Sequence, residues 1–308
     1  MTAEGKLGEG CTWRLYGDGK LEISPTDGKS GTMGVLNRYI PIKHLTKVTS
    51  IVVDKGVKAP ADSANLFSPY YKGYYTEEDL LPFTSIDVSN LDVSDTKNMT
   101  SMFGGCSKVA SIKGLDAWDV SNVTNTSHMF GGCSKVTSIK GLDAWDVSNV
   151  TDMSSMFYGC DALRDLSSLA SWDVSGVTNM SYMFENCHAL SNLSPLASWD
   201  VSGVTNMAFM FAGCEALSDL SPLASWDVSN VTSMLYMFSY CQALSDLSPL
   251  ATWDVSGVRD MRHMFGDCRS LSAATPLNSW TLSSSVDTAA MFDGCDEGIK
   301  TPYWYHEG

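Results

Sequence analysis

Apolar and polar positions recur with one fixed period through most of the chain. The pattern W-D-V-S-x-V-T-x-M-S-x-M-F-x-x-C returns every 27 residues, and tryptophan, the Met-Phe pair and cysteine each keep one position of that unit. A repeat of this length is the signature of a solenoid, in which each unit packs only against its neighbours. The sequence therefore predicts one elongated repeat domain, although 308 residues would ordinarily suggest two domains.

Two periodicities alternate inside a unit. In residues 177–187 the apolar side chains fall at i, i+3, i+7 and i+10, which predicts one face of a short α-helix with Ser175 or Thr178 as its N-cap. Residues 199–201 alternate as a short strand does, and Ser194-Pro195 marks a turn. We expect each unit to contain a strand, a turn, a helix of about two turns and a second extended leg. The predicted fold class is therefore α/β: a leucine-rich-repeat-like, right-handed solenoid with a β-rich N-terminal cap.

The two ends of the chain are predicted to cover the solenoid. Residues 1–44 form the N-terminal cap, which contains a β-hairpin. Residues 45–91 are a degenerate half-repeat with a tyrosine-rich insertion. Residues 92–280 hold seven repeats of 27 residues, and residues 281–308 form a last incomplete repeat and a C-terminal cap.

The charge balance excludes several classes of partner. The chain carries 35 acidic against 20 basic side chains, whereas nucleic acids and anionic membranes attract basic surfaces. The acidity is concentrated in residues 141–258, where Arg164 is the single basic residue against 13 carboxylates. No apolar run approaches the roughly 18 residues of a membrane-spanning helix, so direct membrane insertion is not expected. The first six residues do not resemble a secretory signal.

The repeat resembles a known family. V-T-N-M-S-x-M-F-x-x-C after W-D-V-S is similar to the repeat of BspA-like bacterial surface leucine-rich repeat proteins, and C-T-W…D-G-K-L-E-I-S-P is similar to modules that precede those repeats. The resemblance covers residues 10–300. It implies an extracellular or cell-wall-associated adhesion protein without catalytic activity or cofactors. The S-P-L-A-S segment and the lack of a signal peptide and a sorting tail depart from the family pattern.

Eight of the nine cysteines occupy one repeat position. Equivalent residues of adjacent units would lie ~5 Å apart with parallel Cα–Cβ vectors, which disfavours a disulfide, and no C-x-x-C spacing indicates zinc. We expect a structural ladder of buried, inert thiols. Its members are Cys106, Cys133, Cys160, Cys187, Cys214, Cys241, Cys268 and Cys295.

An aspartate follows each repeat tryptophan up to residue 254, and two roles are open to this column. Each carboxylate can accept hydrogen bonds from the following turn, as in an Asx turn, or successive carboxylates can share calcium ions. Because no G-G-x-G-x-D motif is present, the first role is favoured. The candidate calcium column is Asp119, Asp146, Asp173, Asp200, Asp227 and Asp254.

The residue directly before the second methionine varies from repeat to repeat, and its side chain points outward on the predicted helix. Three adjacent units place aromatic residues there, Tyr182, Phe209 and Tyr236, and two further tyrosines lie at neighbouring outward positions, Tyr158 and Tyr240. Exposed aromatic rows are typical of binding surfaces, although such rings also simply cover a helix. The insertion adds a candidate recognition loop, or a cover for the solenoid edge, with Tyr70, Tyr71, Tyr74 and Tyr75.

These patterns predict a non-catalytic cell-surface scaffold that binds a protein or glycan of a host or a neighbouring microbe. The partner of the aromatic patch should be apolar or aromatic with basic surroundings. The alternative is a carbohydrate-binding module that stacks sugars on the aromatic patch. An enzyme is disfavoured because the five histidines occupy scattered positions.

Overall fold

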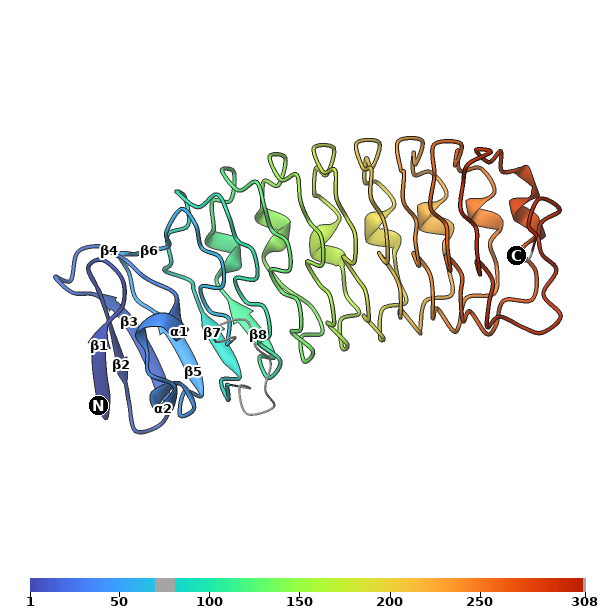
Figure 1. Cartoon of the computed structure of the whole chain (residues 1–308). Helices are drawn as coiled ribbons and strands as arrows, with labels where there is room; N and C mark the ends of the chain where they lie inside the picture. Colours follow the sequence, from blue (N-terminus) through green and yellow to red (C-terminus); the bar gives the residue numbers. More distant parts are fainter. Residues whose placement is uncertain (70–80, 307–308) are drawn as a thin grey trace.

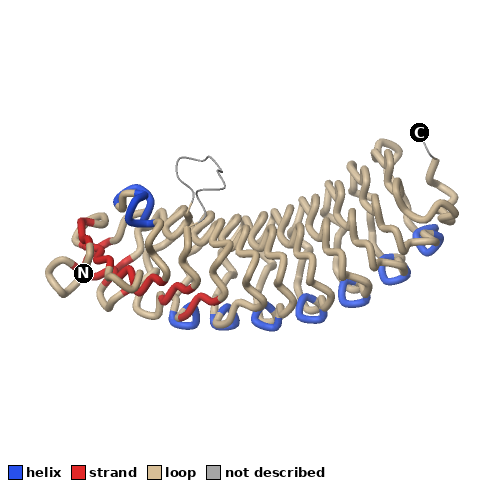
Figure 2. The backbone as a smooth tube through the Cα atoms, turned by 90° about the horizontal axis from the view of Figure 1, so that it is seen from below, coloured by secondary structure: helices blue, strands red, loops and turns tan. Residues whose placement is uncertain are grey.

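The protein is an elongated, gently curved stack of coils that extends from an N-terminal cap (Figures 1 and 2). The computed structural model describes residues 1–69 and 81–306, so the insertion tyrosines Tyr70, Tyr71, Tyr74 and Tyr75 lie outside the described residues. None of the helices in the described part of the chain is long and apolar enough to cross a membrane.

One mixed sheet joins the cap to the first repeat. Its strands, in spatial order, are β1 (Ala3–Lys6), β2 (Cys11–Leu15), β3 (Lys20–Pro25), β5 (Ser50–Val53), β7 (Ser85–Asp87) and β8 (Ser111–Lys113). The first three strands are antiparallel, and from β3 onward the pairing is parallel. The sheet therefore changes from a hairpin cap into the parallel winding of a solenoid.

The remaining cap elements close the N-terminal end of the stack. They are the paired strands β4 (Gly31–Thr32) and β6 (Val57–Lys58) and the short helices α1 (Leu36–Tyr39) and α2 (Ile42–Leu45). The N–H of Leu36 donates to the carbonyl of Leu66 at 3.1 Å, and the side-chain amide of Asn37 donates to the carbonyl of Ser68 at 3.3 Å. Helix α1 thus supplies hydrogen-bond partners to backbone groups of the first coil.

Each repeat in the described chain has a single 3-10 helix, and these helices form a row along one edge of the stack (Figure 2). They are η2 (Leu115–Ala117), η3 (Leu142–Ala144), η4 (Ser167–Leu169), η5 (Ser194–Leu196), η6 (Ser221–Leu223), η7 (Ser248–Leu250) and η8 (Thr275–Ser279). The Ser-Pro pair predicted as a turn begins such a helix, with Pro in the first turn, where its missing N–H removes no helical hydrogen bond. The second leg is therefore not extended as predicted.

The α-helix predicted over residues 177–187 is wrong, and with it the α/β class of the repeats. Tyr182 and Asn186 have left-handed backbones, with φ of 61° and 59°, which an α-helix cannot include. The backbone N–H groups bond across coils instead, from Tyr182 to the carbonyl of Ala208 at 2.8 Å and from Phe184 to that of Met210 at 2.9 Å. Ser175 and Thr178 consequently cap no helix.

The strand predicted at residues 199–201 is also wrong, although its alternation does bury Trp199 and Val201 and expose Asp200. Consecutive coils pair at an isolated parallel bridge, as between Asn179 and Asn206. The right-handed sense of the solenoid stays a prediction.

Columns of identical side chains fill the core. The phenylalanine rings stack from Phe67 to Phe292 with centroids 5.2–5.7 Å apart. Each repeat tryptophan donates its Nε1–H to a carbonyl of the preceding coil, as Trp172 does to Leu142 at 2.7 Å. At the C-terminal end, Tyr305 packs edge-on against Phe292. The core side chains therefore make their packing contacts and hydrogen bonds with neighbouring coils, as expected for a solenoid.

Candidate functional site: an exposed aromatic stack

The residue directly before the second methionine has a left-handed backbone conformation in every repeat. We call its eight residues the ring column, and their φ angles lie between 52° and 61°. They are Ser101, His128, Ser155, Tyr182, Phe209, Tyr236, His263 and Ala290. A left-handed backbone costs a non-glycine residue ~1–2 kcal/mol, and such strain clusters at functional sites. The conformation places the variable side chain on the outside of a tight turn.

Four consecutive members of the ring column stack on one another. The ring centroids are 4.7 Å apart for Tyr182 and Phe209, 4.7 Å for Phe209 and Tyr236, and 4.5 Å for Tyr236 and His263, with interplanar angles of 10–13°. We call these four residues the ring stack. Tyr182 is 38% exposed, and the other three are half-buried. Because the rings cover one another's faces, the stack presents mainly ring edges and polar atoms to solvent.

The two flanking tyrosines lie beside the ring stack without joining it. Tyr158 is 37% exposed, and its ring contacts that of His128, with centroids 5.6 Å apart. Tyr240 is 48% exposed. The negative charge of Asp267, which also accepts a hydrogen bond from the phenol, raises the pKa of Tyr240. The structure therefore brings together Tyr182, Phe209 and Tyr236 as one contiguous feature and adds His263, which the sequence reasoning left out of the site.

Glu185 is a second residue that the sequence reasoning missed. It lies three positions after Tyr182 and is half-buried, and desolvation raises the pKa of its carboxyl to about 7. The repeat position of Glu185 varies, so the sequence did not single it out. The equivalent residues are Gly104, Gly131, Tyr158, Ala212, Ser239, Gly266 and Asp293.

The repeat cysteines are not reactive groups. Each thiol donates to a phenylalanine carbonyl of the preceding coil, as Cys187 does to Phe157 at 3.2 Å. Burial raises the pKa of Cys133 to about 12 and that of Cys187 well above its ordinary value. The thiolate is the reactive form, so these side chains pack as small apolar groups. Cys295 alone among the eight is partly exposed, and the cysteines are free thiols.

The aspartate column is held by hydrogen bonds inside each turn. Oδ1 of Asp200 accepts the backbone N–H of Ser202 at 3.0 Å and its hydroxyl at 2.6 Å. The same bonds lower the pKa of the Asp200 carboxyl. The pattern repeats from Asp119 to Asp254. Within residues 1–69 and 81–306, no three His, Cys, Asp or Glu side chains are grouped so that they could hold a metal ion.

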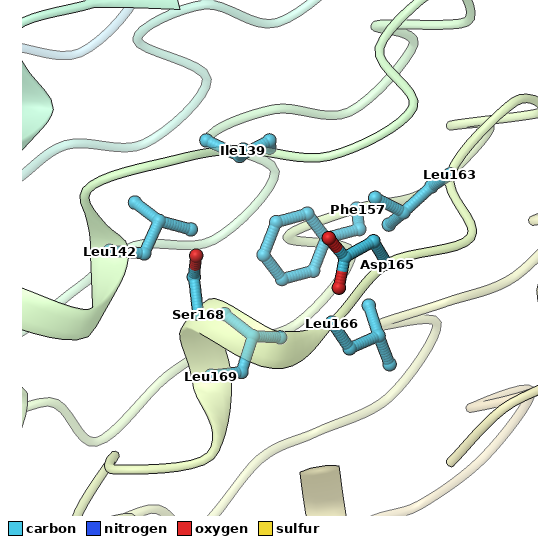
Figure 3. A pocket seen from close by; sticks show the side chains of 8 residues that line it. All are labelled: Ile139, Leu142, Phe157, Leu163, Asp165, Leu166, Ser168 and Leu169. Carbon is cyan, nitrogen blue, oxygen red and sulfur yellow. The ribbon is translucent and has the colours of Figure 1, made fainter. Parts of the chain in front are cut away.

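Two hollows in the described repeats are poor candidates for a ligand site. One of them has a volume of about 10 Å³. Figure 3 shows side chains that line it, among them Ile139, Leu142, Phe157 and Leu166. That volume holds at most one water molecule. An open groove between the first two repeats carries Lys113 and Lys140, but Asp116 and Asp143 line it as well and offset their charge.

The fold and the ring stack define a class of protein: a repeat solenoid that displays side-chain ladders on a rigid axis. The family model described as "Mycoplasma protein of unknown function, DUF285" matches residues 76–196, 134–246 and 190–302. These overlapping matches span most of the chain, so the protein belongs to this family.

Comparison with individual proteins adds little to this assignment. No curated protein matches the chain. A leucine-rich repeat protein from Eubacterium ventriosum is 15% identical, with 99% of this chain and 98% of that chain covered and a TM-score of 0.40. A leucine rich cell surface protein from Faecalibacterium prausnitzii is also 15% identical, with 99% and 96% covered and a TM-score of 0.26. Similarities of this degree do not assign a function.

Proposed function

We propose that the protein is a non-catalytic interaction scaffold of a bacterial surface that binds a protein partner of a host or neighbouring microbe through the ring stack. The observation that carries this proposal is the run of four stacked rings at left-handed positions. Serine and alanine occupy the same position in other repeats, so the turn itself does not require aromatic rings there.

The ring stack is preorganised for binding. Phe209 and Tyr236 are each held between two rings, and each end ring packs on one, on a backbone that is hydrogen-bonded from coil to coil. Side chains that are already ordered lose little conformational entropy when a partner docks, and aromatic residues with a polar end are favoured in protein interfaces. The ring stack thus supplies a rigid, partly apolar strip in the most acidic part of the chain.

The expected location follows from the family resemblance. Repeats of the BspA-like type imply an extracellular or wall-associated adhesion protein, and the similar Faecalibacterium chain is described as a cell surface protein.

The geometry favours a protein over a carbohydrate. A sugar ring that stacks on an aromatic residue needs a free ring face, and both faces of Phe209 and Tyr236 are covered by rings 4.5–4.7 Å away. Only the two ends of the ring stack could offer a face. Carbohydrate binding is therefore the second candidate, restricted to those ends.

The test is a binding screen with matched variants. The protein is assayed against a panel of host-matrix proteins and a glycan array. A triple variant replaces the first three rings with serine, the residue of this position in two other repeats: Tyr182→Ser, Phe209→Ser and Tyr236→Ser. The control triple variant changes exposed or half-exposed residues of the 3-10 row: Ala197→Ser, Ala224→Ser and Ala251→Ser. We expect at least tenfold weaker partner binding for the first variant alone, with both still folded by circular dichroism. Equal binding of both variants would refute the proposal.

A further inference from the structure

The end of the ring stack at Tyr182 differs from its interior. Phe209 covers one face of the Tyr182 ring, whereas the neighbouring member of the ring column on the other side is Ser155, whose side chain is small. Among the described residues no ring packs on that second face of Tyr182. The exposed Tyr158 lies on the same coil as Ser155, but its ring packs against His128 of the preceding coil, with centroids 5.6 Å apart.

Glu185 lies at the same place. Its N–H donates to the carbonyl of Tyr182 at 3.2 Å, and its carbonyl accepts the N–H of Gly159 at 2.8 Å, which sets it on the coil beside Tyr158. A Cβ added at Gly104, the equivalent of Glu185, would lie 3.0 Å from the Cβ of Ser101, the equivalent of Tyr182. The Glu185 and Tyr182 side chains therefore start from adjacent points of one turn.

The Glu185 carboxylate lacks a counter-ion. Across residues 1–69 and 81–306 its side chain makes no hydrogen bond and no ion pair, and it is half-buried. Arg164 is the single basic residue between positions 141 and 258, and its Nε donates instead to the carbonyl of Ala162 at 3.4 Å. Since burying a charge without a partner is unfavourable, a cation supplied from outside would stabilise this carboxylate.

We propose that Tyr182 and Glu185 form a binding site for the guanidinium of an arginine in a basic segment of the partner protein. This proposal deepens the proposed function and rests on it. A guanidinium is planar, stacks on an aromatic face and donates two parallel hydrogen bonds to a carboxylate. The face of Tyr182 that no other ring covers supplies the stacking surface, and Glu185 beside it supplies the carboxylate. The net negative charge of residues 141–258 favours the approach of a basic segment.

The experiment uses defined peptides as probes. Calorimetric titration of the full chain compares acetyl-Gly-Arg-Gly-Arg-Gly-amide with the same peptide in which citrulline, a neutral analogue of similar shape, replaces arginine. The variants are Glu185→Gln, Glu185→Ala and Tyr182→Ser. Glu215→Gln is the control, because it removes one exposed carboxylate from the next coil and leaves the rings unchanged. Thermal unfolding of each variant verifies that the coils remain folded.

We expect about tenfold weaker binding of the arginine peptide to each Glu185 variant and to Tyr182→Ser. Binding to the Glu215 variant should stay within about twofold, and the citrulline peptide should bind about tenfold more weakly than the arginine peptide. Equal losses in the Glu185 and Glu215 variants would reduce the effect to net charge and overturn the site. Equal binding of both peptides would also overturn it, as would no detectable binding of the arginine peptide.

Failure of this inference is distinguishable from failure of the proposed function. If partner binding depends on the ring stack but the arginine peptide does not bind, the result supports the scaffold function and refutes the arginine site. If the triple serine variant binds every partner normally, the proposed function falls whatever the peptide does. Binding of a glycan at Tyr182 would place a sugar at this end of the ring stack and refute the arginine site.

Discussion

A tryptophan-to-phenylalanine substitution tests whether hydrogen bonds between coils stabilise the solenoid. The Trp199 side chain is 4% exposed, and its Nε1–H donates to the carbonyl of Leu169 at 3.0 Å. Trp199→Phe removes that donor, while the Leu169 carbonyl keeps the backbone N–H of Trp172 as a donor at 3.2 Å. The lost hydrogen bond contributes about 0.5–1.5 kcal/mol. The smaller ring adds a cavity whose cost depends on how far the core relaxes.

Trp13 provides an internal control for the cavity. It is 3% exposed, but its Nε1 has no hydrogen-bond partner in the part of the chain that the structure describes. Trp13→Phe makes a comparable cavity and removes an unsatisfied polar group, which by itself is favourable by about 1–3 kcal/mol. We therefore expect Trp199→Phe to be more destabilising than Trp13→Phe by about 1.5–4.5 kcal/mol.

The assay is urea-induced unfolding followed by tryptophan fluorescence and circular dichroism. Hydrogen exchange shows which coils lose stability, because a repeat protein can unfold in parts. For Trp199→Phe we expect faster exchange in the coils adjacent to residue 199. If both substitutions change the unfolding free energy equally, within about 0.5 kcal/mol, the hydrogen bonds between coils contribute nothing to stability and the reasoning is wrong.

Three further predictions follow from the repeats. Burial raises the pKa of Glu185 from 4.5 to about 7, so ionising this carboxyl destabilises the folded chain as the pH rises through that interval. Glu185→Gln should therefore melt at a higher temperature than the wild type at pH 8. The difference in melting temperature should vanish near pH 4. Ala290 has a φ of 53°, so Ala290→Gly should raise the unfolding free energy by about 1 kcal/mol, and an unchanged urea midpoint would contradict the strain argument. In thiol-labelling experiments the half-exposed Cys295 should react first and the buried ladder only after unfolding, whereas uniform labelling of native protein would contradict the burial.

The period and the buried positions could be predicted from the sequence, but the shape of each coil could not. Apolar residues at i, i+3, i+7 and i+10 match an α-helix, and the same spacing also fills the inner side of a turn with two left-handed residues. The ring column gave no warning, since serine, histidine, tyrosine, phenylalanine and alanine share one φ there. The sequence did indicate a left-handed turn four positions later, where glycine recurs at Gly105, Gly132 and Gly159. These glycines have positive φ, a conformation that glycine adopts at no steric cost.

The candidate site was predictable as a set of residues but not as a stack. Its members share a repeat position, which the sequence shows directly. Whether neighbouring rings stack depends on the distance between coils and on the direction in which the left-handed turn points each side chain. Glu185 could not be recognised because its character comes from desolvation by neighbouring coils, and sequence spacing carries no measure of that.

The left-handed turn has an evolutionary consequence. Its conformation is imposed by the coils on both sides, so the side chain at that position can be exchanged without refolding the unit. Eight such positions recur at a constant pitch along one axis. A lineage that keeps the core fixed could rewrite its recognition surface one substitution at a time. Duplicating a unit would lengthen that surface without altering what is already displayed.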